Sequence, residues 1–304
     1  MLGYSCSMND QPPFALFIRG PKAQIFDLAD RLGFESEMNA LAVSVFEDGL
    51  DSMHVQALYA SRTEAEAALA GLNLAGLDIT GVEHFITRLP DEDWVAKSQS
   101  GLPPVEAGRF FIYGAHDKDK IPMHCPYPIL IEAGMAFGTG HHGTTKGCLL
   151  AFENLCAPKS RTKQIAHWPK TILDLGCGSG VLAIAAAKAL NRNVLASDID
   201  MDAIDVTREN ARINQVGEHI EAVQLDGVPK DRGPFDLIFA NILAPPLMAM
   251  ADDIAHALAP AGVVILSGLL DEQADAMINR YEHTGLTLKR RASLAGWTTL
   301  VMRK

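Results

Sequence analysis

The chain has 304 residues, of which 48% are hydrophobic, and its formal net charge at pH 7 is −11. This length and composition suit one large domain or two ordinary ones. No apolar run approaches the roughly 18 residues of a membrane-spanning helix, and the N-terminus lacks the pattern of a signal peptide. The acidic balance disfavours non-specific binding to nucleic acid and suits a basic partner, although solubility alone explains it equally well.

The cysteines and histidines argue for a reducing compartment and against a metal site. The cysteine count is odd and no pair has C-x-x-C spacing, which favours free thiols in the cytoplasm. His141 and His142 are adjacent, but neighbouring side chains rarely reach one ion, and no third ligand has a suitable spacing. We therefore predict a cytoplasmic protein without a metal. The cysteines are Cys6, Cys125, Cys148, Cys156 and Cys177.

The first 90 residues alternate short apolar runs with helical spacings. The strand and helix patterns follow the order βαββαβ, which is typical of a ferredoxin-like α+β domain. No catalytic motif lies among them, so we interpret residues 1–90 as a substrate-recognition domain, with a purely structural appendage as the alternative. The predicted segments are 14–18, 22–32, 42–46, 55–59, 63–72 and 82–87.

A connector separates this domain from the rest of the chain. Pro90 and the acidic run that follows it begin the connector. Leu102-Pro103-Pro104 marks its end, because two successive prolines break regular structure. We therefore predict a linker over residues 91–104 and a second domain over residues 105–304. The second domain begins with a predicted strand at 109–113.

A glycine-rich stretch over residues 134–145 precedes a predicted helix that runs to about Leu155. Thr144 or Thr145 is suited to cap this helix. A glycine loop before a helix N-terminus presents free N–H groups to a polar ligand. A loop shaped only for packing is the alternative.

The most informative motif is a second glycine turn. An apolar strand over 172–175 enters Gly176-Cys177-Gly178-Ser179-Gly180, and a helix-like run over 181–187 leaves it. This is the strand, turn and helix of a nucleotide-type α/β domain. The spacing is G-x-G-x-G, and Asp174 near the strand end would repel a pyrophosphate but attract the ammonium of a methionine group. We therefore predict an S-adenosylmethionine site.

A second carboxylate follows at the end of the next strand. Asp198 lies 18 residues after Gly180, where such domains place a carboxylate against ribose hydroxyls. Asp200 is the rival, or else the cap of the helix predicted from 202 to 214. We favour Asp198 for the ribose.

Two further strand ends carry polar residues. A strand over 220–225 reaches Asp226, which lies either near the adenine or in a plain turn. A buried strand then enters Asn241, followed by Pro245 and Pro246. Ligands bind at this edge of open parallel sheets, and the amide of Asn offers both an acceptor and two donors. A simple turn residue is the alternative for Asn241.

The remaining pattern completes a seven-stranded sheet. We predict a helix at 247–258, a strand at 262–267, a helix at 271–281, and a closing antiparallel pair at 286–291 and 297–302. The expected architecture is a Rossmann-like, seven-stranded α/β methyltransferase domain that follows a ferredoxin-like α+β domain.

Taken together, these motifs resemble the PrmA family, the methyltransferases of ribosomal protein 11 of the large subunit (L11). The resemblance covers essentially the whole chain and is carried by residues 134–145, 174–180, 197–200 and 241–244. The family usually has a threonine at the position of His141 and a proline at the position of Gly143. By position, Thr145, Gly176, Asp198 and Asn241 fall on the family's contacts with S-adenosylmethionine.

The resemblance implies transfer of methyl groups to lysine side chains and to the N-terminal α-amine of L11. It predicts no direct contact with nucleic acid or membrane, and a monomer. Asn241, which can orient the amine, is the candidate catalytic residue. The predicted cofactor contacts are Thr145, Asp174, Gly176, Gly178, Gly180, Asp198 and Asn241.

Three alternatives remain open from the residues alone. The first is a lysine methyltransferase with another protein target. The second is an amino-methyltransferase of nucleic acid, which would carry an aromatic residue after an Asn-Pro-Pro run, whereas this chain has Asn-Ile-Leu-Ala from Asn241. The third is a non-catalytic ribosome-assembly module that binds S-adenosylmethionine.

Overall fold

The computed structural model of the chain divides into two compact units, Met1–Lys97 and Ser98–Lys304, each of which is described by itself. The structure describes residues 14–21, 24–25, 28–29, 32, 40, 42–47, 52–74, 82–88, 104–131, 143–156 and 169–304.

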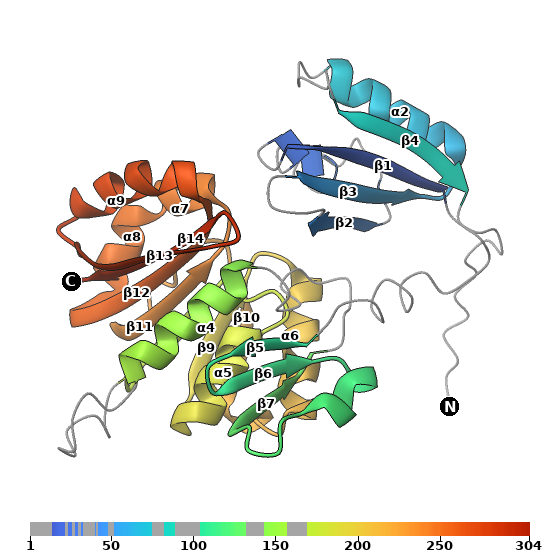
Figure 1. Cartoon of the computed structure of the whole chain (residues 1–304). Coiled ribbons are helices and arrows are strands. Elements are labelled where there is room, and N and C mark those ends of the chain that lie inside the picture. Colours follow the sequence, from blue (N-terminus) through green and yellow to red (C-terminus); the bar gives the residue numbers. More distant parts are fainter. Residues whose placement is uncertain are drawn as a thin grey trace. The chain divides into compact units, whose positions relative to one another are not determined.

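The first unit contains a four-stranded antiparallel sheet in the order β2-β3-β1-β4 (Figure 1). Along β3, alternate side chains from Met53 to Tyr59 are buried, as expected for a strand with one face on the core. Helix α2 contributes Ala65, Ala68 and Leu72 to this core. The elements are β1 (Phe14–Pro21), β2 (Ala42–Glu47), β3 (Ser52–Tyr59), α2 (Arg62–Leu74) and β4 (Glu83–Arg88).

This sheet order is that of the predicted ferredoxin-like pattern, in which the first strand lies in the middle of the sheet. The first predicted helix falls partly outside the described residues, but Ile25, Leu28 and Leu32 within it are helical and buried. Ser61 begins α2 with a reciprocal cap, because its hydroxyl accepts the Glu64 N–H and the Glu64 carboxylate accepts the Ser61 N–H.

The second unit contains a seven-stranded sheet in the order β10-β9-β8-β11-β12-β14-β13. The first five of these strands are parallel, and β14 and β13 are antiparallel additions at one edge. This is the predicted fold class. The strands are β8 (Ile172–Leu175), β9 (Val194–Asp198), β10 (Ile220–Gln224), β11 (Phe235–Asn241), β12 (Leu258–Leu270), β13 (Thr287–Leu294) and β14 (Trp297–Arg303).

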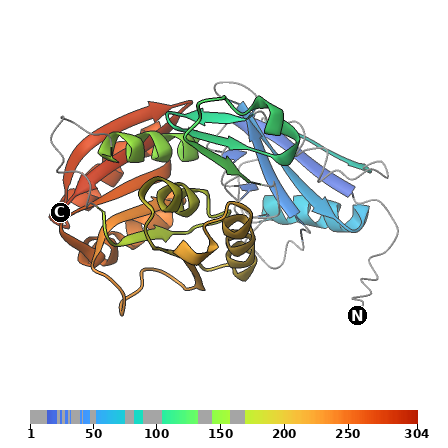
Figure 2. The same ribbon diagram turned by 90° about the horizontal axis from the view of Figure 1, so that it is seen from below.

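Helices cover both faces of this sheet, so successive side chains of a strand enter different cores (Figure 2). Phe239 of β11 packs with the core under α4, α5 and α6, whereas Ile238 packs with the core under α7, α8 and α9. The helices are α4 (Gly143–Cys156), α5 (Val181–Leu190), α6 (Met201–Ile213), α7 (Ala244–Ala249), α8 (Ala251–Ala257) and α9 (Ala274–Glu282), and short 3₁₀ turns lie at Ala115–Lys120, Gly217–His219 and Asp271–Gln273.

The helix predicted at 247–258 is wrong as a single element. It begins earlier, at Ala244, because Pro245 and Pro246 occupy the first turn, where a missing N–H costs no hydrogen bond. It is divided at Met250, which lies between α7 and α8 and has ψ near 5°. None of the described helices is long and apolar enough to cross a membrane.

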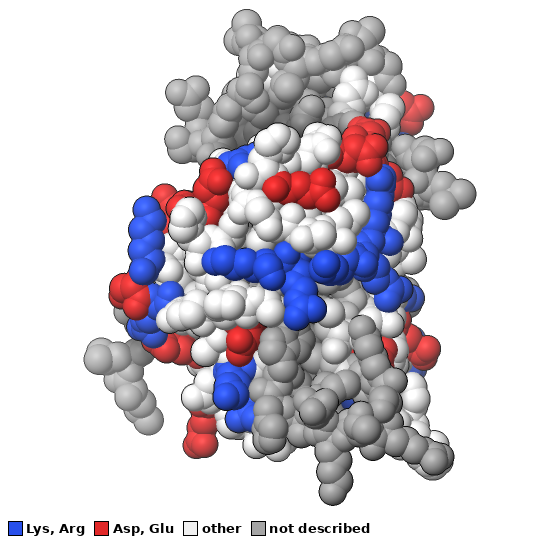
Figure 3. All heavy atoms as spheres, turned by 90° about the vertical axis from the view of Figure 1, so that its left-hand side faces the viewer, with Lys and Arg blue, Asp and Glu red and all other residues white. Residues whose placement is uncertain are grey.

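The edge of the sheet formed by β13 is rich in basic residues. Strand β13 is the last strand, and its side chains are mostly exposed, including Lys289, Arg290 and Arg291. Figure 3 shows Lys and Arg gathered in a band across the side of the molecule that carries the C-terminus. Cations on an edge strand oppose the addition of a strand from another chain.

A small three-stranded sheet in the order β5-β6-β7 packs beside α4 and α5. The strand predicted at 109–113 is β6 (Phe110–Tyr113), whereas β5 (Val105–Ala107) and β7 (Tyr127–Leu130) were not predicted. The sequence of β7 is Tyr-Pro-Ile-Leu, and the proline argues against a strand because proline has no N–H to donate to a neighbouring strand. Proline is tolerated in an edge strand, which β7 is.

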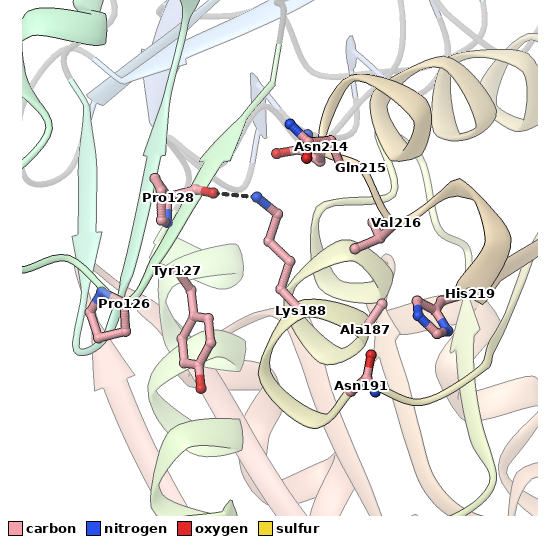
Figure 4. Close-up of a pocket in the computed structure, with 10 residues that line it drawn as sticks. All are labelled: Pro126, Tyr127, Pro128, Ala187, Lys188, Asn191, Asn214, Gln215, Val216 and His219. Atoms are coloured by element: carbon pink, nitrogen blue, oxygen red, sulfur yellow. Dashed lines mark hydrogen bonds between the residues drawn. The ribbon is translucent and has the colours of Figure 1, made fainter.

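Side chains from two helices satisfy the outer edge of β7. Lys188 of α5 donates to the carbonyl of Pro128 at 2.7 Å (Figure 4). Asn214, just after α6, accepts the N–H of Leu130 at 3.0 Å and donates to its carbonyl at 2.6 Å, as a neighbouring strand would. Between these groups lies a pocket of about 360 Å³. Burial lowers the pKa of Lys188, because the ammonium group between α5 and β7 is partly removed from water.

We predict that Asn214→Ala lowers the free energy of unfolding by about 2 kcal/mol, because the half-buried N–H and carbonyl of Leu130 both lose their partner. Urea unfolding followed by circular dichroism measures the change. Glu209→Ala is the matched control on α6, since its ion pair with Arg212 is solvent-exposed and its loss should leave stability nearly unchanged. Equal effects of the two variants would contradict this account of the β7 edge.

Candidate functional site

The predicted glycine turn lies where β8 ends and α5 begins, at the carboxyl edge of the parallel strands. The N–H groups of Gly176 and Cys177 both donate to the carbonyl of Ser197 on β9, at 2.8 and 3.0 Å. These two bonds hold the turn against the neighbouring strand. The turn therefore opens at the edge where ligands bind in sheets of this kind.

The glycines are required by backbone conformation and by space. Gly176, Gly178 and Gly180 have φ of 70°, 52° and 76°, which side-chain-bearing residues rarely adopt. A Cβ on Gly176 would also lie 2.2 Å from Ile242, and one on Gly180 would lie 2.9 Å from Thr207. The absence of a Cβ therefore lets the turn pack closely against Ile242 and Thr207.

Asp198 joins the turn, whereas Asp200 does not. The Asp198 carboxylate accepts the N–H of Gly178 at 2.9 Å through Oδ2 and the N–H of Asp200 at 3.1 Å through Oδ1. The Asp200 side chain instead accepts the N–H of Asp202 and caps α6. Of the two candidates, only Asp198 contacts the glycine turn.

Asp174 is buried beneath the turn, with 1% of its surface exposed. Its Oδ2 accepts the N–H of Ala183 at 2.9 Å, in the first turn of α5, where Gly180 offers no side-chain cap. The carboxyl group therefore ties the helix start to β8. Burial raises the pKa of Asp174 to about 8; the Ala183 bond lowers it and the nearby Asp198 charge raises it.

Asn241 and Thr145 meet at the end of β11. The Asn241 amide nitrogen donates to the hydroxyl of Thr145 at 3.4 Å, so residues 96 positions apart in sequence are brought together. Oδ1 of Asn241 is buried and has no hydrogen-bond partner among the described residues. A buried acceptor without a donor is costly in a folded protein, and it is expected where a ligand supplies the donor.

Helix α4 brings Thr145 to this point by close packing. Gly143 and Gly147 lie one turn apart on α4, and a Cβ on Gly147 would lie 2.1 Å from the hydroxyl of Thr299 on β14. A Cβ on Gly143 would lie 2.7 Å from the carbonyl oxygen of Leu294 on β13. The two glycines therefore allow α4 to lie against the edge hairpin. Thr145 itself is fully buried.

Comparison with known proteins identifies the family. The sequence model described as ribosomal protein L11 methyltransferase (PrmA) matches residues 24–304. The ribosomal protein L11 methyltransferase of Rhodopseudomonas palustris is 41% identical over 95% of this chain and 97% of its own length, and that of Bradyrhizobium diazoefficiens is 42% identical over 98% of both. The crystal structure of ribosomal protein L11 methylase from Lactobacillus delbrueckii subsp. bulgaricus is 29% identical, with a TM-score of 0.57, and the alignment covers 66% of this chain and 98% of that one.

The chain belongs to the PrmA family. As a member it is an S-adenosylmethionine-dependent methyltransferase, and the predicted fold class, reaction type and cofactor are confirmed.

One departure from the PrmA pattern has a structural reason. The family usually has a proline at the position of Gly143. In this chain the space that a side chain would occupy is taken by the carbonyl of Leu294 and by the ring of Trp297, 3.0 Å from the ideal Cβ. The hairpin between β13 and β14 thus fills this volume. The other departure, His141, lies outside the described residues together with His142 and most of the 134–145 loop.

Sequence reasoning missed Ile199, which follows Asp198 and is 61% exposed. An exposed apolar side chain beside Asp198 is a candidate contact for a flat ring. The signal was its place directly after the strand-end carboxylate.

Asp226 is exposed just beyond β10, and both of its interpretations, a residue near the adenine and a plain turn residue, remain predictions. Within the described residues, no group of three or more His, Cys, Asp or Glu side chains is placed to hold a metal ion.

The raised pKa of Asp174 predicts how stability depends on pH. An unfolded Asp releases its proton near pH 4, whereas the folded carboxyl keeps it to about pH 8. Between these values the folded state binds the extra proton, so the contribution of this group to the free energy of unfolding falls as pH rises. Asp174→Asn removes this dependence while keeping an acceptor for Ala183.

We therefore predict that, without cofactor, the stability of Asp174→Asn relative to the wild type increases from pH 5 to pH 8. Urea unfolding at both pH values measures the difference. Parallel pH profiles of the two proteins would contradict the assignment of a protonated Asp174.

Proposed function

We propose that this chain transfers methyl groups from S-adenosylmethionine to amines of ribosomal protein L11, at lysine side chains and at the N-terminal α-amine. The observation that carries the proposal is identity of 41–42% to L11 methyltransferases over nearly the full length of both chains. A partner of this kind suits the charge of the chain, because ribosomal proteins are commonly basic and the chain carries a net charge of −11.

The described residues fit the cofactor. We assign the backbone of the turn at Gly176, Gly178 and Gly180 to the methionine part. Asp198 is assigned to the ribose hydroxyls, because each of its oxygens accepts one backbone N–H and keeps a lone pair for a hydroxyl donor. Asp174 lies under the same turn, and a cation bound above it would favour the ionised carboxylate.

The bound cofactor supplies a methyl group already activated on a sulfonium. What the protein must add is a neutral amine held in line with that methyl. Asn241 is suited to this task because its nitrogen is directed at Thr145, which leaves Oδ1 free to accept an N–H from the amine. Thr145 thereby fixes which end of the amide faces the substrate.

Proton release does not require a basic side chain at this point. A free lysine amine has a pKa near 10.4 and must lose a proton before each transfer. Neither Asn241 nor Thr145 titrates in this range, and we propose that water takes the proton. The rate should therefore rise with pH as the neutral amine becomes more abundant.

The remaining assignments extend the same proposal. We assign substrate recognition to residues 1–90 and a connecting role to residues 91–104, since every assigned cofactor contact lies after residue 143. We propose that the protein acts as a monomer in the cytoplasm and contacts neither nucleic acid nor membrane. Another protein target, or a non-catalytic binding role, is decided by the experiment that follows.

The proposed activity is tested by incubating the protein with methyl-labelled S-adenosylmethionine and, separately, purified L11, other ribosomal proteins and ribosomal RNA. We expect label in L11 alone, on amines located by mass spectrometry. Label only in another ribosomal protein, or in RNA, would contradict the proposed target. Binding of the cofactor without any transfer would favour the non-catalytic alternative.

We predict that Asn241→Ala lowers kcat by about 100-fold while the affinity for S-adenosylhomocysteine falls much less, because misplacing a reacting amine by about 1 Å is costly. Steady-state kinetics with L11 and calorimetry with S-adenosylhomocysteine give the two quantities.

Thr145→Val and Thr145→Ser form the matched pair for this prediction. Valine removes the hydroxyl that orients the Asn241 amide, and serine retains it. We expect the valine variant to lose turnover and the serine variant to keep it. Equal losses of turnover and cofactor affinity in Asn241→Ala would mean that Asn241 only holds the cofactor.

A further inference from the structure

Helix α6 presents an unusual buried polar face. Thr207 and Asn210 on α6, and Asn214 just after it, follow one another at spacings of three and four residues, and they are 0%, 3% and 6% exposed. Such residues are neutral or unfavourable in helix interiors, since their side chains compete for backbone groups. Their burial here calls for partners outside the helix.

Thr207 contacts three of the five residues of the glycine turn. Its hydroxyl donates to the carbonyl of Gly178 at 2.9 Å and lies 3.3 Å from the thiol of Cys177. Since the one hydroxyl hydrogen is directed at Gly178, the Cys177 thiol is the donor of the second bond. Burial raises the pKa of that thiol, which keeps it protonated. The side chain also fills the space above Gly180.

Asn210 holds the next carbonyl of the same turn. Its amide nitrogen donates to the carbonyl of Ser179 at 2.9 Å, so two successive peptide groups are fixed from one helix face. The N–H of Gly178 is fixed as well, by the Asp198 carboxylate. Gly178 is therefore held on both sides, and the conformation of the turn is coupled to the position of Asp198.

We infer that Thr207 and Asn210 are positioning residues for cofactor binding, which hold the carbonyls of Gly178 and Ser179 so that the turn and Asp198 face one site. This inference rests on the proposed role of the turn as the cofactor cradle. The two residues act through the turn backbone and are outside the set of predicted cofactor contacts. Asn214, at the far end of the same face, bonds to Leu130 of β7 and to the backbone carbonyl of Asn210, and it makes no hydrogen bond to the turn in the described structure.

Removing the Thr207 hydroxyl should weaken cofactor binding and leave kcat nearly unchanged. Thr207→Val keeps the shape of the side chain but leaves the Gly178 carbonyl and the Cys177 thiol without their partner. The affinity for S-adenosylhomocysteine should fall at least about 10-fold, and the KM for S-adenosylmethionine should rise by a similar factor, because a half-buried carbonyl without a donor is costly and the turn shifts to regain one. At saturating cofactor, kcat should stay within about twofold, since Asn241 and Thr145 are untouched. Thr207→Ser retains the hydroxyl and should restore most of the affinity.

The test compares Thr207→Val, Thr207→Ser, Asn210→Ala and Asn214→Ala in the full-length protein. Calorimetry with S-adenosylhomocysteine is run well below each melting temperature, and cofactor kinetics are measured with L11. Asn214→Ala controls for stability, because it should lower the melting temperature and leave affinity within about twofold. Asn210→Ala provides a second reading should Thr207→Val fail to fold.

Each outcome is decisive. Weakened binding in Thr207→Val and Asn210→Ala, with rescue by serine and normal binding in Asn214→Ala, supports the inference. Normal affinity in Thr207→Val or Asn210→Ala overturns it, as does an equal loss in Asn214→Ala. If the wild-type protein itself binds no S-adenosylhomocysteine, the proposed function fails instead.

Discussion

The site depends on one backbone arrangement, the fastening of the Gly176–Gly180 turn to the end of β9. Two N–H groups of the turn share the Ser197 carbonyl, and a third, from Gly178, reaches the carboxylate of the next residue, Asp198. Positive φ at three glycines makes this path possible, and no other residue type adopts it so cheaply. The Asp198 carboxylate is therefore joined directly to the turn, and we propose that the two together bind the nucleoside and amino-acid parts of the cofactor.

Much of this follows from the sequence because the evidence for it is local. Apolar runs that end in a glycine turn, Asp198 or Asn241 are contiguous in the chain, and parallel strands place their ends together. The βαββαβ order of the first unit was likewise readable from periodicity. Asp198 is favoured over Asp200 from its place at the strand end, and the structure adds that the Asp200 side chain caps α6.

The features that sequence reasoning missed rest on distant partners. Strand β7 contains a proline, and its outer edge is bonded by Lys188 and Asn214, which lie 60 and 84 residues further along the chain. Thr207 and Asn210 look like ordinary polar helix residues until burial reveals their partners. Asp174 was interpreted only as a charge for the cofactor, yet it also caps α5. Such roles depend on three-dimensional neighbours, which spacing does not encode.

Calorimetry of S-adenosylhomocysteine binding to the wild type, Asp198→Ala and Asp200→Ala tests the central claim, that the turn and Asp198 form the cofactor site, most directly. Loss of a hydrogen bond to a charged partner costs about 1.5–3 kcal/mol, so Asp198→Ala should bind roughly 10- to 150-fold more weakly. Asp200→Ala should bind almost as the wild type does, with only the stability of α6 reduced. Unchanged affinity in Asp198→Ala, with a large loss in Asp200→Ala, would contradict the account.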